Sequence, residues 1–321
     1  MKHLIDITEW TKEELETVFS WTLTMKKHPD PGFKPLAGRS VALYFEKPSL
    51  RTRVSFDIGI QELGGNTTIV EQFMAGIGTR ESVHDVANTL NGFVDAMVCR
   101  LFNHQTLHEL RQWSDMSIVN ALTDFSHPCQ IMADVVTLKE IGLWNDGHFT
   151  LTWVGDPNNV LQSWLEMALF YPIKVIVSSP DIPTAFQSWF DDPRMKDRLT
   201  WIQNPKQAIS LADVVYLDTW ISMGQEDEAE ARLAKYAAYQ VNEEMTGYMQ
   251  DHAVILHCLP AKRGQEVDDF TMNKFKPVIF RESENRLHVQ KTILGYLLEP
   301  VRMAWFCSQF PQESTSPLVK A

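Results

Sequence analysis

The sequence predicts an α/β protein with two doubly wound domains, each built on a mainly parallel central sheet. Short apolar runs alternate along the chain with helical patterns, which is the order typical of α/β proteins. Most of these runs are apolar almost throughout, as expected for strands covered by helices on both faces. The chain has 321 residues, which is enough for two domains with separate cores.

Six runs are predicted as strands from their β-branched and aromatic content. They are residues 40–45 (SVALYF), 94–100 (VDAMVCR), 149–155 (FTLTWVG), 173–179 (IKVIVSS), 213–218 (DVVYLD) and 253–258 (AVILHC). The first helix is predicted to begin after Thr11, because Glu14 follows at capping-box spacing and the next residues have helical periodicity.

Two later helices set the predicted domain organisation. A helix from about Gln130 to Ile141 is expected to join a first domain, residues 1–140, to a second domain, residues 141–290. One final helix, from Leu287 to about Trp305, is expected to pack back on the first domain.

Composition excludes several classes of function. A net charge of −12 and a pI near 5.3 argue against a general surface for nucleic acids or anionic membranes. The four cysteines show no C-x-x-C spacing, which favours a reducing compartment. The first residues contain no apolar signal core and no stretch approaches the ~20 apolar residues of a membrane span, so a cytoplasmic protein is expected.

In open α/β sheets, ligands bind beyond the carboxyl ends of the strands. After the first strand comes Ser49-Leu50-Arg51-Thr52-Arg53, where helix N-H groups, hydroxyls and guanidinium groups together suit an oxyanion. An N-capped surface helix with solvated arginines is the alternative.

Two further strand ends in the first half carry polar groups. Arg100 closes one apolar run, and the alternative there is a snorkelling surface arginine. The segment His127-Pro128-Cys129-Gln130 directs an imidazole and an amide toward one point, as recognition of a carbonyl group would require. A buried histidine with satisfied hydrogen bonds is the competing interpretation.

The second half offers groups suited to an amino acid. Asn158 and Asn159 follow a strand without the G-x-G-x-x-G pattern of dinucleotide sites, so they either cap a helix or present amides to a ligand. Asp218 ends a strand and precedes a loop with Ser222 and Met223, a combination that suits both poles of an amino acid.

Metal and organic cofactors are not expected. A buried, inert thiol is the usual state of a lone cysteine and is the competing interpretation for Cys258, and His257 is expected to point away from it along the strand. Zinc would need further ligands at recognisable spacing, which the sequence does not offer. Arg286, beside two acids, completes the candidate residues.

Five segments resemble the aspartate/ornithine carbamoyltransferase superfamily: SLRTR, HPCQ, DTWISMG, HCLP and ENRLHVQK, in this order. DTWISMGQE with HCLP is most similar to its ornithine carbamoyltransferase branch. The resemblance implies a homotrimer, a cis Leu259-Pro260 bond, and carbamoyl phosphate and L-ornithine as substrates. It implies a carbamoyl phosphate site of Ser49, Leu50, Arg51, Thr52, Arg100, His127, Gln130, Cys258, Leu259 and Arg286. It implies an ornithine site of Asn159, Asp218, Ser222 and Met223, and catalysis by Cys258, Asp218, Arg100 and His127.

The chemistry of carbamoyl transfer agrees with these residue types. Arginine and neutral histidine donors would stabilise the developing oxyanion. The δ-ammonium of ornithine must lose a proton before it attacks, and Asp218 with Cys258 is our hypothesis for the acceptor. Binding, orientation and electrostatics supply the acceleration without a cofactor.

Three positions depart from the family pattern. Leu50 stands where relatives have a small or hydroxyl residue, Gly76 where they often have Gln or His, and Pro157 where they have Gly. Because SLRTR also occurs in carbamoyltransferases of acylated ornithine, N-acetyl- or N-succinyl-ornithine is the alternative substrate, ahead of putrescine. An inactive binding or regulatory relative is the alternative of another class. The sequence leaves open whether the reaction serves arginine synthesis or breakdown.

Overall fold

The computed structural model describes residues 2–72, 76–221 and 226–310. These fall into two compact units. Among the described residues, 2–136 and 285–310 form the first unit, and Thr137–Glu284 form the second unit. Within the described residues, no helix is both long enough and apolar enough to cross a membrane.

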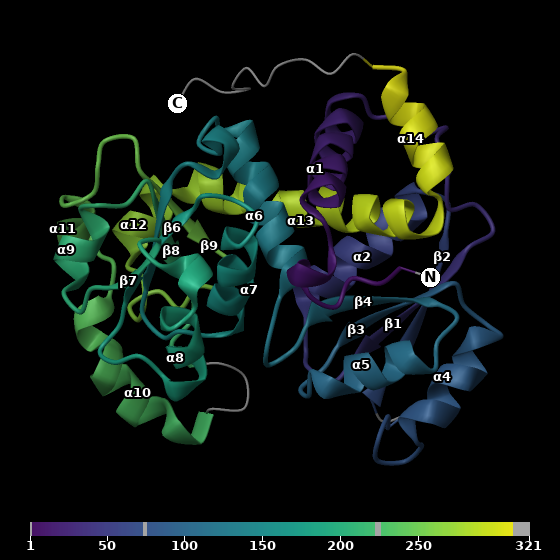
Figure 1. The fold of residues 1–321 in the computed structure, drawn as a ribbon, viewed down its shortest axis with the longest axis horizontal. Coiled ribbons are helices and arrows are strands. Elements are labelled where there is room, and N and C mark those ends of the chain that lie inside the picture. The colour runs from purple at the N-terminus through teal and green to yellow at the C-terminus, as the bar shows by residue number, and fades with distance from the viewer. Residues whose placement is uncertain (1, 73–75, 222–225, 311–321) are drawn as a thin grey trace. The chain divides into compact units, whose positions relative to one another are not determined.

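The first unit is built on a parallel sheet of order β2-β1-β3-β4. Its strands are β1 (Ser40–Phe45), β2 (Asn66–Glu71), β3 (Ala96–Arg100) and β4 (Ser117–Leu122). Its helical segments are η1 (Ile7–Glu9), α1 (Lys12–Lys27), α2 (Leu50–Glu62), α4 (Val83–Asn91), α5 (Gln105–Gln112), the start of α6 (Pro128–Glu140), most of α13 (Lys276–Leu298) and α14 (Pro300–Ser308). Figure 1 shows α4 and α5 on one face of this sheet and α1, α2 and α13 on the other.

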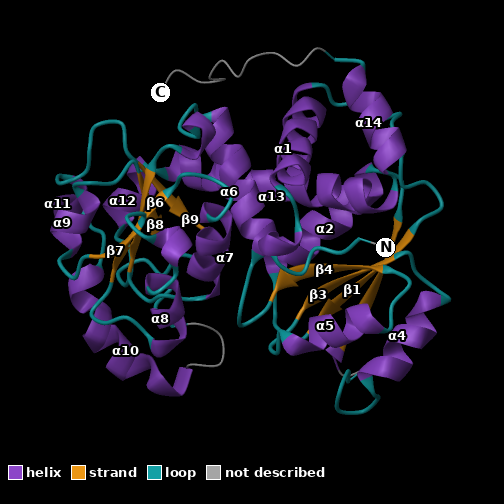
Figure 2. Ribbon diagram, in the orientation of Figure 1, coloured by secondary structure: helices purple, strands orange, loops and turns teal. Residues whose placement is uncertain are grey.

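The second unit is built on a parallel sheet of order β7-β6-β5-β8-β9. Its strands are β5 (Thr150–Val154), β6 (Lys174–Ser178), β7 (Leu199–Trp201), β8 (Val214–Leu217) and β9 (Val254–His257). Its α-helices are α7 (Asn159–Ala168), α8 (Thr184–Phe190), α9 (Pro205–Ile209), α10 (Ala229–Tyr236), α11 (Glu243–Thr246) and α12 (Asp269–Lys274), and its 3-10 turns are η2 (Asn145–Gly147), η3 (Pro193–Met195), η4 (Glu226–Glu228) and η5 (Ala237–Tyr239). Figure 2 shows these strands as an inner layer among helices.

Strand order fixes where each sheet can bind a ligand. In the first unit the chain moves outward from β1 to β2 and then returns to β3 on the other side of β1. In the second unit it moves from β5 to β7 and then returns to β8 on the other side of β5. Crevices form where the order reverses. The candidate sites are therefore the carboxyl ends of β1 and β3, and of β5 and β8.

The predicted fold class is confirmed, and each of the six predicted runs contains a strand. Three strands were not predicted. β2 and β7 are edge strands with exposed positions, so neither has the continuous apolar run of a buried strand. β4 is buried but contains Asn120, whose side-chain amide donates to the Ile5 carbonyl (2.9 Å).

The helix predictions differ in outcome. The capping box is present, because Thr11 Oγ1 accepts the Glu14 N-H (3.3 Å) and Glu14 Oε2 accepts the Thr11 N-H (2.9 Å). The single final helix from Leu287 to Trp305 is wrong. The chain forms two helices, α13 and α14, and Glu299 between them is non-helical (φ −141°, ψ 52°). Pro300 explains the break, since proline disfavours helical geometry in the preceding residue and suits a first helical position.

Buried side chains form a core in each unit. In the first unit they include Tyr44, Met97 and Ile118, all without solvent exposure. In the second unit the rings of Trp153 and Tyr216, from adjacent strands β5 and β8, stack with centroids 5.2 Å apart. These cores hold the strand ends rigidly beside each crevice.

Candidate active site

Two buried arginines meet at one hydroxyl in the first unit. Thr52 lies in the first turn of α2, directly beyond β1, and is completely buried. Its Oγ1 accepts hydrogen bonds from Arg100 Nη1 (3.3 Å) at the end of β3 and from Arg286 Nη2 (2.5 Å) on α13. Both arginines are under 10% exposed, at 8% and 3%. The structure thus brings together three of the residues predicted for a carbamoyl phosphate site.

This arrangement concentrates positive charge. Both groups donate to the same oxygen, so Arg100 Nη1 and Arg286 Nη2 lie no farther apart than the combined length of these two hydrogen bonds. At about 5 Å and an effective dielectric constant of about 20, two unit charges repel by about 3 kcal/mol. A bound anion would attract both cations and so offset this repulsion, and guanidinium groups match phosphate oxygens in geometry. The site therefore suits a phosphate or carboxylate group.

His127 lies beside these cations as a neutral imidazole. It is 3% exposed and precedes Pro128, the first residue of α6. Burial, followed by the charges of Arg286 and Arg100, lowers its pKa well below the usual value. A neutral imidazole can donate to a carbonyl oxygen without adding charge to a site that is already positive.

Gln130 and Cys129 belong to the same segment. Gln130 is fully buried, and its Nε2 donates to Asp134 Oδ1 one turn later (2.8 Å), which fixes the orientation of the amide. Burial raises the pKa of Cys129 to about 12, so that this thiol stays protonated. Its Sγ donates to the carbonyl of Asn120 (3.3 Å), which makes Cys129 a packing residue.

The start of α2 places the other predicted phosphate ligands. Ser49 occupies the N-cap position, yet its hydroxyl makes no capping hydrogen bond within the described part of the chain. Arg51 is half-buried in the first turn, and Leu50 is 75% exposed. The capped-surface-helix alternative therefore does not describe Ser49. The Leu50 side chain lies largely in solvent, so its backbone N-H is the group that it offers at this helix end.

Lys47 is a further cation that we did not assign from the sequence. It follows β1, is 6% exposed, and its Nζ lies 4.4 Å from the ring centroid of Phe102. Burial lowers its pKa, against the opposing effect of Asp124. The available signal was its position two residues after a predicted strand, where ligand-binding groups are expected.

Gly76, which stands where relatives often have Gln or His, has a backbone conformation that favours glycine. Gly76 has φ +52°, and a Cβ there would lie 2.7 Å from the Cβ of Arg80. Any side chain at this position is therefore strained in the present backbone. Residues 73–75, just before it, lie outside the described residues.

In the second unit, Asp218 receives three hydrogen bonds beyond β8. Its Oδ1 accepts from Cys258 Sγ (3.0 Å) and from the Thr219 N-H (2.8 Å). Its Oδ2 accepts from Asn158 Nδ2 (2.6 Å) at the end of β5. An ionised carboxylate has about four acceptor sites, which leaves room for one more donor. Asp218 and Cys258, predicted as a pair, lie in contact.

Asn158 is fixed in orientation by its second role. It is the N-cap of α7, and its Oδ1 accepts the Val160 N-H (2.9 Å) while its amide nitrogen faces Asp218. The sequence left open whether this residue caps a helix or presents its amide to a ligand; the structure shows the cap, with the amide nitrogen donated to Asp218. Asn159, predicted for ornithine, is the first residue of α7 and is half-buried.

The segment after β9 corrects one expectation. His257 was expected to point away from Cys258, but candidate ligand atoms of Asp218, His257 and Cys258 all lie within 4.8 Å of one another. The strand ends at His257, so side-chain alternation does not extend to Cys258. Spacing in the sequence therefore missed this group of possible ligands. The imidazole is already engaged, because Nδ1 accepts the Leu259 N-H (3.0 Å) and Nε2 lies 3.2 Å from Glu266 Oε1.

The same contacts shape the loop after Cys258. Leu259 has φ +55°, and the Leu259-Pro260 peptide is cis. Glu266, which we did not identify from the sequence, is fully buried and accepts the Lys262 N-H (2.5 Å) as well as facing His257. Ser222 and Met223, predicted for ornithine, lie outside the described residues.

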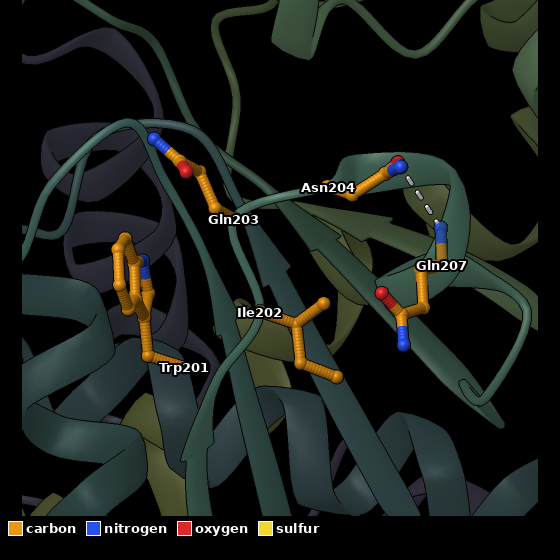
Figure 3. A pocket seen from close by; sticks show the side chains of 5 residues that line it. All are labelled: Trp201, Ile202, Gln203, Asn204 and Gln207. Atoms are coloured by element: carbon orange, nitrogen blue, oxygen red, sulfur yellow. Dashed lines mark hydrogen bonds between the residues drawn. The ribbon is translucent and has the colours of Figure 1, made fainter.

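A hollow elsewhere in the second unit does not contain the candidate site. Its volume is about 530 Å³, and it is lined by Trp201, Ile202, Gln203, Asn204 and Gln207. Figure 3 shows these residues along the segment that leaves β7, with Asn204 hydrogen-bonded to Gln207. β7 is two strands away from the β5/β8 crevice, and none of the predicted site residues is among those lining the hollow.

Comparison with protein families matches both halves of the chain. Residues 2–140 match the carbamoyl-P binding domain of aspartate/ornithine carbamoyltransferase. Residues 148–297 match the Asp/Orn binding domain of the same family. The two matches together span most of the chain.

Individual relatives agree with the family models. An ornithine carbamoyltransferase of Chlorobaculum tepidum is 40% identical over 288 residues, which are 88% of this chain and 85% of the relative. One of Archaeoglobus fulgidus is 37% identical over 308 residues, covering 93% and 98%. Among solved structures, the anabolic ornithine carbamoyltransferase of Campylobacter jejuni has a TM-score of 0.86 at 31% identity, covering 92% of this chain and 99% of that chain. The chain belongs to the aspartate/ornithine carbamoyltransferase family.

Proposed function

We propose that the chain transfers the carbamoyl group of carbamoyl phosphate to the side-chain amine of L-ornithine, giving L-citrulline and phosphate. The meeting of Arg100 and Arg286 at Thr52 is the observation that carries this proposal. The names of the relatives and the descriptions of the two matched domains support the choice of substrates.

The first unit would bind carbamoyl phosphate. The α2 N-terminus, with Ser49, Leu50, Arg51 and Thr52, receives the phosphate oxygens, because helix N-H groups and guanidinium charge both favour an anion. Arg286 extends the same positive surface. As the bond to phosphate breaks, negative charge grows on the leaving group, and these cations stabilise it.

The carbamoyl oxygen would face Arg100 and His127, with Gln130 beside them. Arg100 supplies charge, and His127 supplies a neutral donor because its pKa is depressed. Each donor matters in proportion to the charge that develops on the oxygen, and losing one such donor typically costs ~10²–10³ in rate. Leu259 and Cys258, predicted at the reacting centre, belong to the second unit.

The second unit would bind ornithine. Asp218 keeps one acceptor position beyond its three hydrogen bonds, which suits the δ-ammonium group of the substrate. The amine must become neutral before it attacks the carbamoyl carbon. We assign the departing proton to Asp218, either directly or through the contacting thiol of Cys258. Asn159, Ser222 and Met223 remain the proposed contacts for the amino-acid end.

We also propose that copies of the chain assemble, as a homotrimer or a multiple of trimers. An apolar stripe on α2 supports this: Leu50, Val54 and Ile58 are 75%, 50% and 40% exposed and recur every fourth residue. Val54→Glu with Ile58→Glu should shift the mass measured by light scattering toward the monomer. Val301→Glu, at an 80% exposed position on α14, is the control that should leave the mass unchanged. A monomeric parent protein would contradict the proposal.

A reducing, cytoplasmic setting completes the proposal. All four cysteines, Cys99, Cys129, Cys258 and Cys307, are free thiols. A protein that works with free thiols fits a compartment that keeps them reduced.

The decisive experiment supplies the purified chain with carbamoyl phosphate and each candidate acceptor in turn. L-Ornithine should give citrulline and one equivalent of phosphate. Turnover restricted to N-acetyl- or N-succinyl-ornithine would move the assignment to that alternative substrate. Failure with every acceptor, despite a folded protein, would favour the inactive binding relative.

A further inference from the structure

A second cluster of metal-binding side chains lies in the first unit, apart from the residues assigned to carbamoyl transfer. It consists of Asp6, His104 and His108, whose candidate ligand atoms all lie within 4.8 Å of one another. We propose that this Asp6-His104-His108 cluster binds a divalent transition-metal ion, with Zn²⁺ as the reference ion.

The two histidines form a chelating pair on one helix. His104 precedes α5 and already has helical geometry (φ −65°, ψ −35°), so His108 follows it by one helical turn. Their ring centroids are 5.0 Å apart. Two imidazoles four residues apart on a helix are a known way to hold zinc. Rotation of the partly exposed His108 ring would bring one of its nitrogens to bonding distance from a metal ion held by the other two side chains.

Asp6 supplies a carboxylate from a different segment. The N-terminal segment is held along β4, where the Leu4 N-H donates to Ile118 O (2.9 Å). Asp6 Oδ2 lies 3.1 Å from His104 Nε2, and these two side chains are 12% and 13% exposed. Asp6 Oδ1 accepts the hydroxyl of Ser126 (2.7 Å), which leaves Oδ2 as the oxygen for the metal.

The second nitrogen of His104 has the partner that a metal ligand needs. Nδ1 lies 2.8 Å from Thr123 Oγ1. With a metal on Nε2, the ring proton is on Nδ1 and is donated to Thr123 Oγ1, where it competes with the longer contacts from the N-H groups of Phe125 (3.3 Å) and Ser126 (3.2 Å). The Thr123 hydroxyl then directs its own hydrogen toward the carbonyl of Ser126, 3.5 Å away. Such outer contacts fix the tautomer and orientation of a ligating imidazole.

The ligand set selects the class of metal. Two imidazoles and one carboxylate suit Zn²⁺, Co²⁺ or Ni²⁺, whereas Mg²⁺ and Ca²⁺ prefer oxygen ligands alone. The neighbouring cation Arg111 is paired with Glu9 (2.5 Å), which reduces its repulsion of a metal ion. Three protein ligands leave a fourth position for water.

A bound metal would join three parts of the first unit: the N-terminal segment, α5, and the segment Thr123–Ser126. Because that last segment directly precedes His127, the metal would also brace the chain that carries it. Metal that binds only the folded state stabilises it by mass action, lowering the unfolding constant about 100-fold at a free concentration about 100 times Kd.

The test uses ZnCl₂ in calorimetric titration, with thermal unfolding in parallel. The full chain carrying Cys258→Ala is the background, because this change removes the thiol from the Asp218-His257-Cys258 group. We expect one equivalent of Zn²⁺ to bind and to raise Tm, with reversal by a chelator. His108→Gln should weaken binding by more than about tenfold, as even outer-shell changes commonly do. His84→Gln removes a surface histidine paired with Asp85 in the same unit and should change neither quantity.

Two outcomes of the zinc titration overturn the proposal. Zinc binding that is unchanged by His108→Gln places the metal elsewhere, and no binding by the folded background protein removes the site. If His108→Gln does not fold, Asp6→Asn tests the same ligand set, with circular dichroism to verify folding. Cobalt substitution at one equivalent in the otherwise unchanged chain gives a further check: a thiolate-to-metal absorption band would place the ion at the Asp218-His257-Cys258 group and overturn the proposal, because the Asp6-His104-His108 cluster contains no thiol.

Discussion

Replacing Asp218 with asparagine separates the structural and chemical roles of this carboxylate. In the native chain its two oxygens accept from Cys258, the Thr219 N-H and Asn158. The oxygen of the new amide can replace Oδ1, but the amide nitrogen must then face the amide nitrogen of Asn158. The side-chain amide of Asn158 cannot exchange the positions of its oxygen and nitrogen without losing the capping hydrogen bond from the Val160 N-H. The two donors therefore oppose each other.

The expected cost follows from this geometry. A lost hydrogen bond to a charged group is worth about 1.5–3 kcal/mol, and giving up the cap instead would cost about 1 kcal/mol. We expect Asp218→Asn to lower the free energy of unfolding by about 2 kcal/mol, measured by urea denaturation. Turnover should fall by ~10²–10⁴, because the proton acceptor is lost.

A double substitution tests the reasoning. Asn158→Asp with Asp218→Asn reverses donor and acceptor: the new amide beyond β8 donates to the new carboxylate before α7, and aspartate still caps that helix well. Stability should return and turnover should not. Asp213→Asn is the matched control. Asp213 directly precedes β8 and Asp218 directly follows it, so Asp213 lies at the opposite end of the strand from the proposed site and its replacement should leave turnover unchanged. Turnover restored in the double variant would refute the assigned proton transfer, and stability left unrestored would refute the hydrogen-bond argument.

Three further predictions concern the remaining site residues. Arg51→Ala should raise KM for carbamoyl phosphate, whereas exposed Arg53→Ala should not; equal kinetics for the two would remove Arg51 from the phosphate site. Cys258→Ala should lower kcat more than it lowers Tm, while Cys307→Ala should leave kcat unchanged; full activity in the Cys258 variant would make that thiol a packing residue. His127 has a depressed pKa in the folded state, so the unfolded chain binds its proton first as pH falls below about 6.5, and stability falls by up to about 1.4 kcal/mol per pH unit. In urea titrations from about pH 7 to about pH 5, His127→Gln should therefore lose part of this pH dependence, and an unchanged slope would show that His127 is not a buried neutral group.

Hydrophobic pattern and local chemistry were enough to predict much of the fold. Buried parallel strands such as β1 and β8 are apolar on both faces, so their sequences alone identify them. Strands β2 and β7 lack that signal because their side chains are largely exposed, whereas β9, which is also an edge strand, is buried and apolar. Pro300 marks the break between α13 and α14 in the sequence, and the prediction of a single helix did not take this proline into account.

The sequence by itself determined which residue types follow each strand, and therefore that one unit offers cations and the other a carboxylate. Tertiary structure alone decided which of them touch. Thr52 and Arg286 are separated by 234 positions yet share a hydrogen bond, and Asn158 reaches Asp218 across the crevice between β5 and β8. The reason is physical: local sequence sets backbone conformation over a few residues, whereas side-chain partners depend on the strand order, which is fixed by packing of the whole sheet.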